Sequence, residues 1–283
     1  MPEVELRGAE VDGLTLHYLT EGRGPVVVLV HGLGGFAESW RHNVAALARV
    51  ATVYAVDLPG FGLSSKPPAR YRLADAARAL HGFIQAMDLG RVAVVGHSLG
   101  AAVGLTYALT HPARVERLAL LGALVPGSTF RLSWPYRIAA TPMLGELLAL
   151  CGCAPVYRAA IARCFHAPVA EEVDYLVREG YAARTGPEAK AAYLATLRDL
   201  RRDVVDHAPD YRRALATLDA PVLIIHGRQD RVISPAHCTE ASEALPRAQV
   251  RWIDACGHFP QIEHADVVNG WLTEFLVGRP APR

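Results

Sequence analysis

The sequence predicts an α/β fold, in which a mostly parallel sheet is covered by helices on both faces and interrupted by a helical insertion. Short, β-branched apolar runs alternate with helix-like stretches before residue 125 and again after residue 218. Such alternation is typical of a buried parallel sheet. Between these two parts, strand-like runs disappear and helix starts multiply. With 283 residues, 51% of them hydrophobic, the chain can form one large domain with an insertion.

The N-terminal part of the core, residues 1–124, is expected to begin with a hairpin and then to alternate between strand and helix. Asp12-Gly13 lies between two alternating segments, which is a hairpin signal at a sheet edge. Val26 to Val30 follows the turn signal Gly24-Pro25 and is expected to be a buried strand. The pattern continues with helices and strands in turn, at 36–48, 52–56, 73–87, 92–95, 98–110 and 115–121.

Residues 125–218 are expected to form a helical cap, and residues 219–283 the C-terminal part of the core. Thr141-Pro142 and Gly186-Pro187 both have the pattern of a helix start. The cap is rich in leucine, alanine and aromatic side chains, which favours an apolar acyl or aromatic substrate. The same side chains also suit packing of the cap on the sheet. After residue 218 we expect strands at 221–227 and 250–253.

The pentapeptide Gly96-His97-Ser98-Leu99-Gly100 is the most informative motif. It follows the apolar run 91–95 and opens a helix-like stretch, so it predicts a strand, a sharp turn and a helix. A serine on such a strained turn needs small neighbours, and the two glycines provide them. Ser98 is therefore the expected nucleophile.

An acid and a base follow the serine in the chain, each just past an expected strand. Asp230 comes after the strand at 221–227, and His258 comes after the strand at 250–253. A histidine can take the proton of a serine hydroxyl, and an aspartate can orient that histidine. Asp57 is the main rival acid, but it precedes Pro59-Gly60, where an aspartate commonly binds the turn.

The glycine-rich loop His31-Gly32-Leu33-Gly34-Gly35 is expected to supply part of an oxyanion hole. Backbone N–H groups in such a loop can point at a ligand without side chains in the way. The expected donors are the N–H groups of Leu33 and Leu99, with Gly34 as the alternative to Leu33. His31 and His97 are expected to support the loop and the turn rather than to transfer protons.

These motifs together resemble the α/β-hydrolase superfamily along almost the whole chain. The resemblance implies an eight-stranded sheet, a helical cap over the nucleophile, and a triad of nucleophile, acid and base in the order Ser98, Asp230, His258. The matching segments are His31-Gly32 with Trp40, the segment from Asp57 to Ser64, the Ser98 pentapeptide, Gly227-Arg228-Gln229-Asp230 and Gly257-His258.

Several reactions are compatible with this resemblance. Hydrolysis of apolar acyl or aromatic carboxylic esters through an acyl-serine intermediate is expected first, because the plain pentapeptide suits carboxylesterases. The alternative is the carbon–carbon hydrolases that act on ring-fission products of aromatic degradation, since their C-terminal motif resembles residues 256–269. Phe259 and Gly34-Gly35-Phe36 depart from that group, which usually has tryptophan and Gly-Pro-Gly there, while Arg178 could bind the substrate carboxylate. Thioesterase, lactonase, perhydrolase and slow receptor-like binding functions remain open.

Composition excludes several other classes. The formal net charge of +1 and the scattered arginines give no case for a nucleic-acid partner. The 12 histidines form no recognised metal motif, so neither a metal nor an organic cofactor is expected. We expect a cytoplasmic protein without an integral membrane segment, monomeric or homodimeric, with substrate-binding residues unassigned. The five cysteines are expected to be buried, reduced thiols, at positions 151, 153, 164, 238 and 256.

Overall fold

The computed structural model describes residues 2–8, 11–129, 134–151 and 153–278, and it has the predicted α/β architecture. Eight strands form one sheet in the order β1-β2-β4-β3-β5-β6-β7-β8. Only the first two are antiparallel to their neighbours, and the other six run parallel. The strands span Glu3–Glu5, Thr15–Gly22, Val26–Val30 (β3), Thr52–Val56 (β4), Val92–His97 (β5), Val115–Leu121 (β6), Val222–Gly227 (β7) and Ala248–Ile253 (β8).

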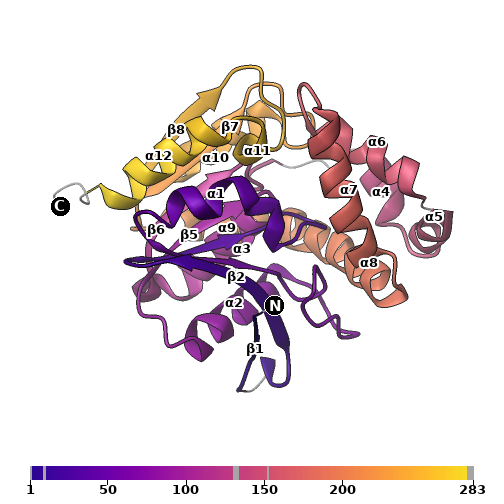
Figure 1. Ribbon diagram of the computed structural model, residues 1–283, viewed down its shortest axis with the longest axis horizontal. Coiled ribbons are helices and arrows are strands. Elements are labelled where there is room, and N and C mark those ends of the chain that lie inside the picture. The colour runs from indigo at the N-terminus through magenta and orange to yellow at the C-terminus, as the bar shows by residue number, and fades with distance from the viewer. Residues whose placement is uncertain (1, 9–10, 130–133, 152, 279–283) are drawn as a thin grey trace.

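The central strands are buried because helices cover both faces of the sheet. Every residue of β5 and β7 is buried, which explains why these runs lack a polar alternation. One face carries α1 and α12, and the other carries α2 and α3 (Figure 1). Helix α10 joins the second face through its buried residues. Their bounds are Arg41–Leu47 (α1, after a short turn at Ala37–Trp40), Leu73–Ala86 (α2), Leu99–Thr110 (α3), Pro235–Ala244 (α10) and Ala265–Val277 (α12).

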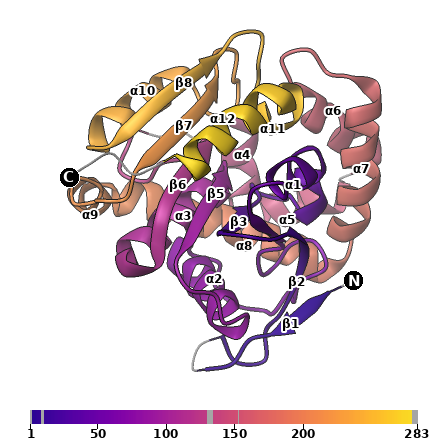
Figure 2. The same ribbon diagram turned by 60° about the vertical axis from the view of Figure 1, so that its left-hand side comes forward.

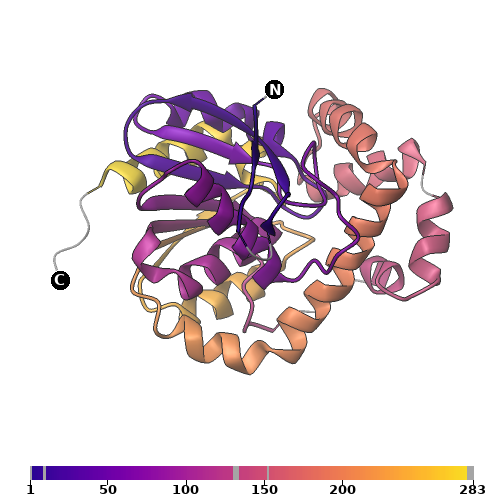
Figure 3. The same ribbon diagram turned by 90° about the horizontal axis from the view of Figure 1, so that it is seen from below.

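Among its described residues, the part of the chain between β6 and β7 consists of helices joined by loops and turns. Helices α4 to α8 lie beside the sheet, at the right of Figures 1 and 3, whereas α9 turns back beneath the sheet. Leu215 at the end of α9 is fully buried in the larger core cluster. The helices span Trp134–Ala139 (α4), Leu144–Cys151 (α5), Ala154–Cys164 (α6), Ala170–Arg184 (α7), Pro187–Arg201 (α8) and Ala208–Leu215 (α9), with a π-helical turn at Arg202–Asp206.

Two aspartates tie the helical segment to the start of α2. Asp203 in the π-helical turn accepts the backbone N–H of Leu73 at 2.7 Å and pairs with the Arg72 guanidinium at 2.9 Å. Asp199 accepts the N–H of Tyr71 at 2.9 Å. These bonds satisfy N–H groups at a helix N-terminus that have no intrahelical partner. The helical segment is therefore fixed to the core at its C-terminal end.

The cysteine prediction is partly wrong. Cys238 and Cys256 are buried, but Cys153 is exposed at the start of α6 and Cys164 is half-buried. The fifth position, 151, is one whose side chain lies outside the described part. Cys153 is exposed because α6 buries none of its residues, so an apolar-looking helix can still lie on the surface.

Candidate active site

The Ser98 turn has the geometry that the pentapeptide predicts. Ser98 stands between β5 and α3 with φ of 53° and ψ of −114°, a conformation that costs backbone strain. A Cβ on Gly96 would lie 2.4 Å from the Gly100 carbonyl oxygen, and one on Gly100 would lie 2.1 Å from that of Val30. Both positions therefore require glycine.

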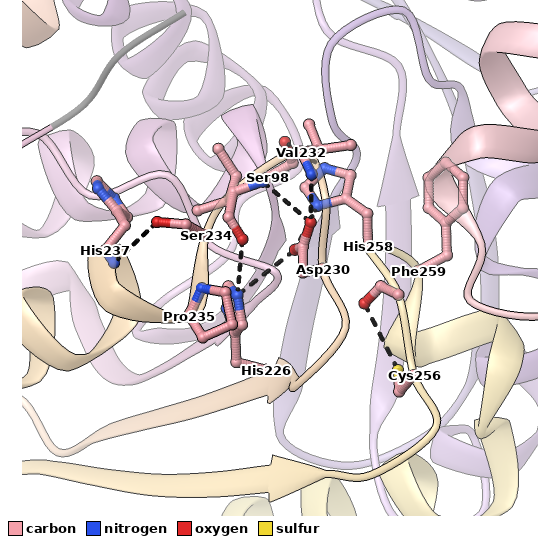
Figure 4. A network of polar contacts seen from close by, with 12 residues as sticks. Ser98, His226, Asp230, Val232, Ser234, Pro235, His237, Cys256, His258 and Phe259 are labelled. Atoms are coloured by element: carbon pink, nitrogen blue, oxygen red, sulfur yellow. Dashed lines mark hydrogen bonds and ion pairs between the residues drawn. The ribbon is translucent and has the colours of Figure 1, made fainter. Parts of the chain in front are cut away.

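The structure brings the three predicted side chains together (Figure 4). Nε2 of His258 lies 3.0 Å from the hydroxyl oxygen of Ser98, and Nδ1 lies 2.8 Å from Oδ2 of Asp230. The ends of β5, β7 and β8 meet at one edge of the sheet, so residues 160 positions apart in the chain become neighbours. Ser98 is partly exposed, whereas Asp230 and His258 are buried.

Asp230 is held as a carboxylate by several donors. Its Oδ1 accepts the backbone N–H groups of Val232 and Ile233 at 2.7 and 2.9 Å. Burial disfavours the charged form, but the neighbouring His258 and these hydrogen bonds outweigh it and lower the pKa of Asp230. The carboxylate is thus ready to orient the Nδ1–H of His258 and to stabilise the ring when it is protonated.

A second histidine, His226, approaches the same carboxylate (Figure 4). Its Nε2–H donates to the carbonyl of Ile233 at 3.0 Å and lies 3.5 Å from Oδ2 of Asp230. Burial lowers the pKa of His226, so the ring is neutral at pH 7. The sequence reasoning missed this residue. The signal available was a histidine in the otherwise apolar run of β7.

His97 and His31 support the site through hydrogen bonds. The Nε2–H of His97 donates to the backbone oxygen of His258 at 2.8 Å, and burial lowers the pKa of His97 to about 3. The Nε2 of His31 accepts the N–H of Leu58 at 3.0 Å, so Nδ1 carries the proton and donates to the Gly32 oxygen at 2.8 Å. One histidine thus holds the base loop, and the other holds the glycine-rich loop.

The two predicted oxyanion donors remain available. Leu99 is the first residue of α3, where an N–H has no intrahelical acceptor. In the glycine-rich loop, the N–H of Gly35 bonds the Gly32 carbonyl at 2.9 Å, while the N–H groups of Leu33 and Gly34 have no acceptor among the described residues. Leu33 thus keeps its place beside Gly34 as a candidate.

Asp57 has the turn-binding role that the sequence suggests. Its carboxylate accepts the N–H groups of Ala37 and Leu63 at 2.6 and 2.8 Å, and it pairs with buried His17 at 2.8 Å. This hydrogen bond raises the pKa of His17 against the effect of burial. Asp57 is therefore fully occupied in joining loops, away from His258.

Arg178 does not reach a buried site. Its side chain is 67% exposed, its Nε donates to Glu179 at 2.9 Å, and its guanidinium stands 5.5 Å from the ring centre of Tyr175. A cavity of about 470 Å³ is lined by Leu99, the residue after Ser98, and by the loop after β4 and the start of α2. Three other arginines line it as well: Arg70, Arg72 and Arg78. Arg70 lies at this cavity and is exposed.

Within the described part of the chain, no group of three or more histidine, cysteine, aspartate or glutamate side chains could hold a metal ion. The described helices also include none that is both long and apolar enough to cross a membrane.

Comparison with known proteins gives the same picture along the whole chain. A model of the alpha/beta hydrolase family matches residues 27–271. The chain is 29% identical over 278 residues to a 2-hydroxy-6-oxo-6-(2'-aminophenyl)hexa-2,4-dienoic acid hydrolase of Metapseudomonas resinovorans, covering 96% of this chain and 91% of that protein. It is 30% identical over 265 residues to a 2-hydroxy-6-oxo-2,4-heptadienoate hydrolase of Pseudomonas putida, covering 90% of each.

A solved structure is similar as well. The meta-cleavage product hydrolase of Pseudomonas fluorescens superposes with a TM-score of 0.82 at 25% sequence identity, over 98% of this chain and 97% of that one. The matched residues 27–271 make up far more than half of the chain, and they include Ser98, Asp230 and His258. The chain belongs to the alpha/beta hydrolase family and is a hydrolase.

Proposed function

We propose that the protein is a serine hydrolase that cleaves a carbon–carbon bond in dienoate products of aromatic ring fission. The observation that carries this proposal is the similarity over at least 90% of the chain to two curated hydrolases of 2-hydroxy-6-oxo-dienoates. It reverses the order expected from sequence, where ester hydrolysis stood first. The triad geometry serves either reaction, because both begin with attack of a serine on a carbonyl carbon.

In the proposed reaction, His258 takes the proton of Ser98 as the hydroxyl oxygen attacks the 6-oxo carbonyl of the substrate. Asp230 fixes the tautomer of His258 and stabilises the imidazolium that forms. The N–H groups of Leu99 and Leu33 bind the developing oxyanion, each contributing about 3 kcal/mol to transition-state stabilisation. Before this bond can break, the enol proton of the dienoate has to move from the 2-hydroxyl group to C5, because only the resulting 2,6-dioxo form can accept the electrons of the C5–C6 bond. The carbon–carbon bond then breaks, and its electron pair passes through the C3–C4 double bond to the 2-oxo group, which takes up a proton.

The acyl-serine that remains is hydrolysed by water. His258 now removes a proton from the water, which attacks the acyl carbon and releases the carboxylic acid and free Ser98. An ester substrate would follow the same route, with an alkoxide as the leaving group in place of the dienoate carbon. The two reactions therefore differ in what the leaving group requires and not in the nucleophile.

A second function, ester hydrolysis, is favoured by the surroundings of Arg178. A dienoate carries a carboxylate that needs a cationic partner, and Arg178 is two-thirds exposed and paired with its neighbour Glu179. If no other cation serves, an uncharged ester fits the site better. We propose Arg70, at the cavity bordered by Leu99, as that other cation.

The deciding experiment compares turnover of 2-hydroxy-6-oxo-6-phenylhexa-2,4-dienoate with that of p-nitrophenyl esters from acetate upward. Dienoate cleavage far above ester turnover supports the proposal, and the reverse result supports the esterase. Ser98→Ala should abolish both activities together with labelling by a fluorophosphonate probe. Undiminished labelling of Ser98→Ala would exclude Ser98 as the nucleophile.

Two arginine variants sharpen the comparison. Arg70→Ala should raise KM for the dienoate and leave KM for p-nitrophenyl acetate unchanged, because only the dienoate carries a carboxylate. Arg178→Ala is the matched control and should change neither. A raised KM for the dienoate in Arg178→Ala but not in Arg70→Ala would show that Arg178, and not Arg70, binds the substrate carboxylate.

A further inference from the structure

A half-buried carboxylate lies behind the histidine loop and is not part of the triad. Glu263, the last residue of the short helix α11 (Pro260–Glu263), accepts the backbone N–H of Gly257 at 2.9 Å and that of Phe259 at 3.3 Å through one oxygen. Its other oxygen accepts the N–H of His166 at 2.7 Å. His166 follows the end of α6, so one carboxylate binds both the histidine loop and the helical segment.

His258 lies between Gly257 and Phe259, and its own backbone N–H is also hydrogen-bonded. It donates to the carbonyl of Cys164, the last residue of α6, at 2.7 Å. Three consecutive amides of the loop are thus fixed, two by Glu263 and one by α6. The approach is so close that a Cβ on Gly257 would lie 2.4 Å from the Cys164 oxygen.

The close donors to Glu263 are backbone N–H groups, and the Cys256 thiol lies 4.0 Å from the same oxygen that binds Gly257. No lysine, arginine or histidine lies within ion-pair distance of its carboxylate in the described residues. Burial raises the pKa of Glu263, and the three N–H donors act against that rise. Since a buried carboxylate without a cationic partner is costly, its hydrogen bonds to the main chain must be the reason that the site tolerates it.

The contact also lies in an apolar cluster between the core and the helical segment. Phe165, between Cys164 and His166, is 3% exposed, and Ile262 beside Glu263 is 8% exposed. Phe259 packs against Phe165 with ring centres 5.1 Å apart. Figure 2 shows α11 near the end of α6, in agreement with the contacts of Cys164 and His166. A low-polarity setting strengthens the hydrogen bonds that Glu263 makes.

We propose that Glu263 is a positioning residue that couples the helical segment to His258, fixing the main chain on both sides of that histidine to the end of α6. The inference rests on the proposed role of His258 as the general base. Displacement of α6 would release the loop and move Nε2 of His258 from its 3.0 Å contact with Ser98. The helical segment therefore controls the base as well as covering the nucleophile.

The two halves of this coupling can be separated by substitution. Glu263→Gln keeps an amide oxygen for the N–H groups of Gly257 and Phe259, but it turns an NH2 group toward the N–H of His166. Two donors then face each other, so the tie to α6 is lost while the loop stays held. Glu263→Ala removes both halves. Glu274→Gln, which changes a carboxylate paired with Arg251 on α12, is the matched control.

The labelling rate, the KM and the thermal melting temperature are measured on each purified full-length variant. Labelling by a small fluorophosphonate reports the Ser98–His258 pair alone, and KM for the preferred substrate reports the seating of the helical segment. Glu263→Gln should label within about threefold of wild type and raise KM about tenfold, the cost of one hydrogen bond to a charged group. Glu263→Ala should also lose about tenfold or more in labelling rate.

Two results would overturn the inference. Wild-type labelling by Glu263→Ala would show that the carboxylate does not position His258. An equal loss of labelling in Glu263→Gln and Glu263→Ala, at equal melting temperatures, would show that the charge matters rather than the pair of acceptors. If Glu263→Ala fails to fold, the isosteric Glu263→Gln still decides through its split between KM and labelling.

The outcome is distinguishable from a failure of the proposed function. Ser98→Ala and His258→Ala, measured beside the Glu263 variants, must lose labelling if the triad is catalytic. Retained labelling in both would defeat the proposed function whatever Glu263 does. Loss of labelling in both, with Glu263 variants like wild type, would defeat only the coupling.

Discussion

The sheet edge that carries Ser98 and the helical segment that faces it are built in different ways. All residues of β5 and β7 are buried, and the loops after them are held by backbone ladders on both sides. By contrast, α6 buries none of its residues, and Val156 on it is 62% exposed. Strands locked on both sides place atoms accurately, whereas loosely packed helices can vary. We therefore expect the first region to carry the chemistry and the second to govern substrate choice.

The largest effect is expected at the sheet edge, from Asp230→Asn. The amide preserves the shape of the side chain but stabilises the wrong tautomer of His258, so kcat should fall about 10⁴-fold. Asp254→Asn, a change at an 86% exposed carboxylate near the same loop, is the control and should leave kcat unchanged. Steady-state kinetics on the preferred substrate measures both. Similar kcat values for the two variants would mean that the triad acid lies elsewhere.

Gly100→Ala should cause the largest loss of stability. The new Cβ would lie 2.1 Å from the Val30 oxygen and 2.6 Å from that of His31, both parts of the rigid backbone of the sheet edge. We expect a loss of about 3 kcal/mol or more in the free energy of unfolding, typical of severe overpacking. Urea unfolding followed by circular dichroism measures it. A loss below about 1 kcal/mol would show that the backbone at this sheet edge can shift to make room for the methyl group, and is not rigid.

Phe165→Ala tests a strongly buried contact between the helical segment and the core. Phe165 is 3% exposed and packs on Phe259, so its removal leaves a cavity and should cost about 2–4 kcal/mol, with a rise in KM. Val156→Ala on the exposed side of the same segment should change neither value by much. If the two variants behave alike, the segment has no defined seat on the core.

The buried histidines of the sheet edge predict acid sensitivity. Burial lowers the pKa of His31, His97, His226 and His237 below the ordinary value of 6.5. The folded protein then binds fewer protons than the unfolded chain below that pH, so the free energy of unfolding should fall as the pH drops from 6.5. The window for His97 extends down to about 3.

Urea unfolding at a series of pH values measures this slope, and His97→Gln should make it shallower. His17 acts in the opposite sense, because Asp57 raises its pKa and its contribution is lost as the pH rises above 6.5. An unchanged slope in His97→Gln would mean that this histidine does not remain neutral in the folded state.

The smallest effect is expected from Gly270→Ala in α12. A Cβ at Gly270 would meet nothing within 4 Å, and alanine favours a helix over glycine by about 0.5–1 kcal/mol. Thermal melting should show a slight stabilisation. Compared with Gly100→Ala, this variant shows how strongly the effect of one added methyl group on the free energy of unfolding depends on the space around it. A destabilised Gly270→Ala would remove the contrast.

The sequence predicted the sheet and the placement of Ser98, Asp230 and His258 because these depend on local patterns. Apolar runs mark the buried strands, and small residues mark the tight turns at their ends. The contacts of Asp57 were also predictable, since an aspartate before Pro59-Gly60 commonly binds its turn. These features are set by the backbone within a few residues.

The remaining features depend on contacts between distant segments, which no local pattern reports. Arg178 stands in the middle of α7, and its exposure depends on how that helix packs. Cys153 is apolar in character, but it lies at the start of α6, a helix that has no buried residue. Glu263 gains its partner His166 only when α6 and α11 meet. Such pairings are fixed by packing and cannot be inferred from spacing.

The place of β8 at the outer end of the sheet has a consequence for the newly made chain. His258 follows the strand that is added last, and that strand is paired only with β7. A nascent chain on the ribosome that has emerged as far as α10 already holds the serine, its strained turn and the aspartate, but it has no base. With His258 as the proposed base, we expect hydrolysis to begin only when this final strand docks.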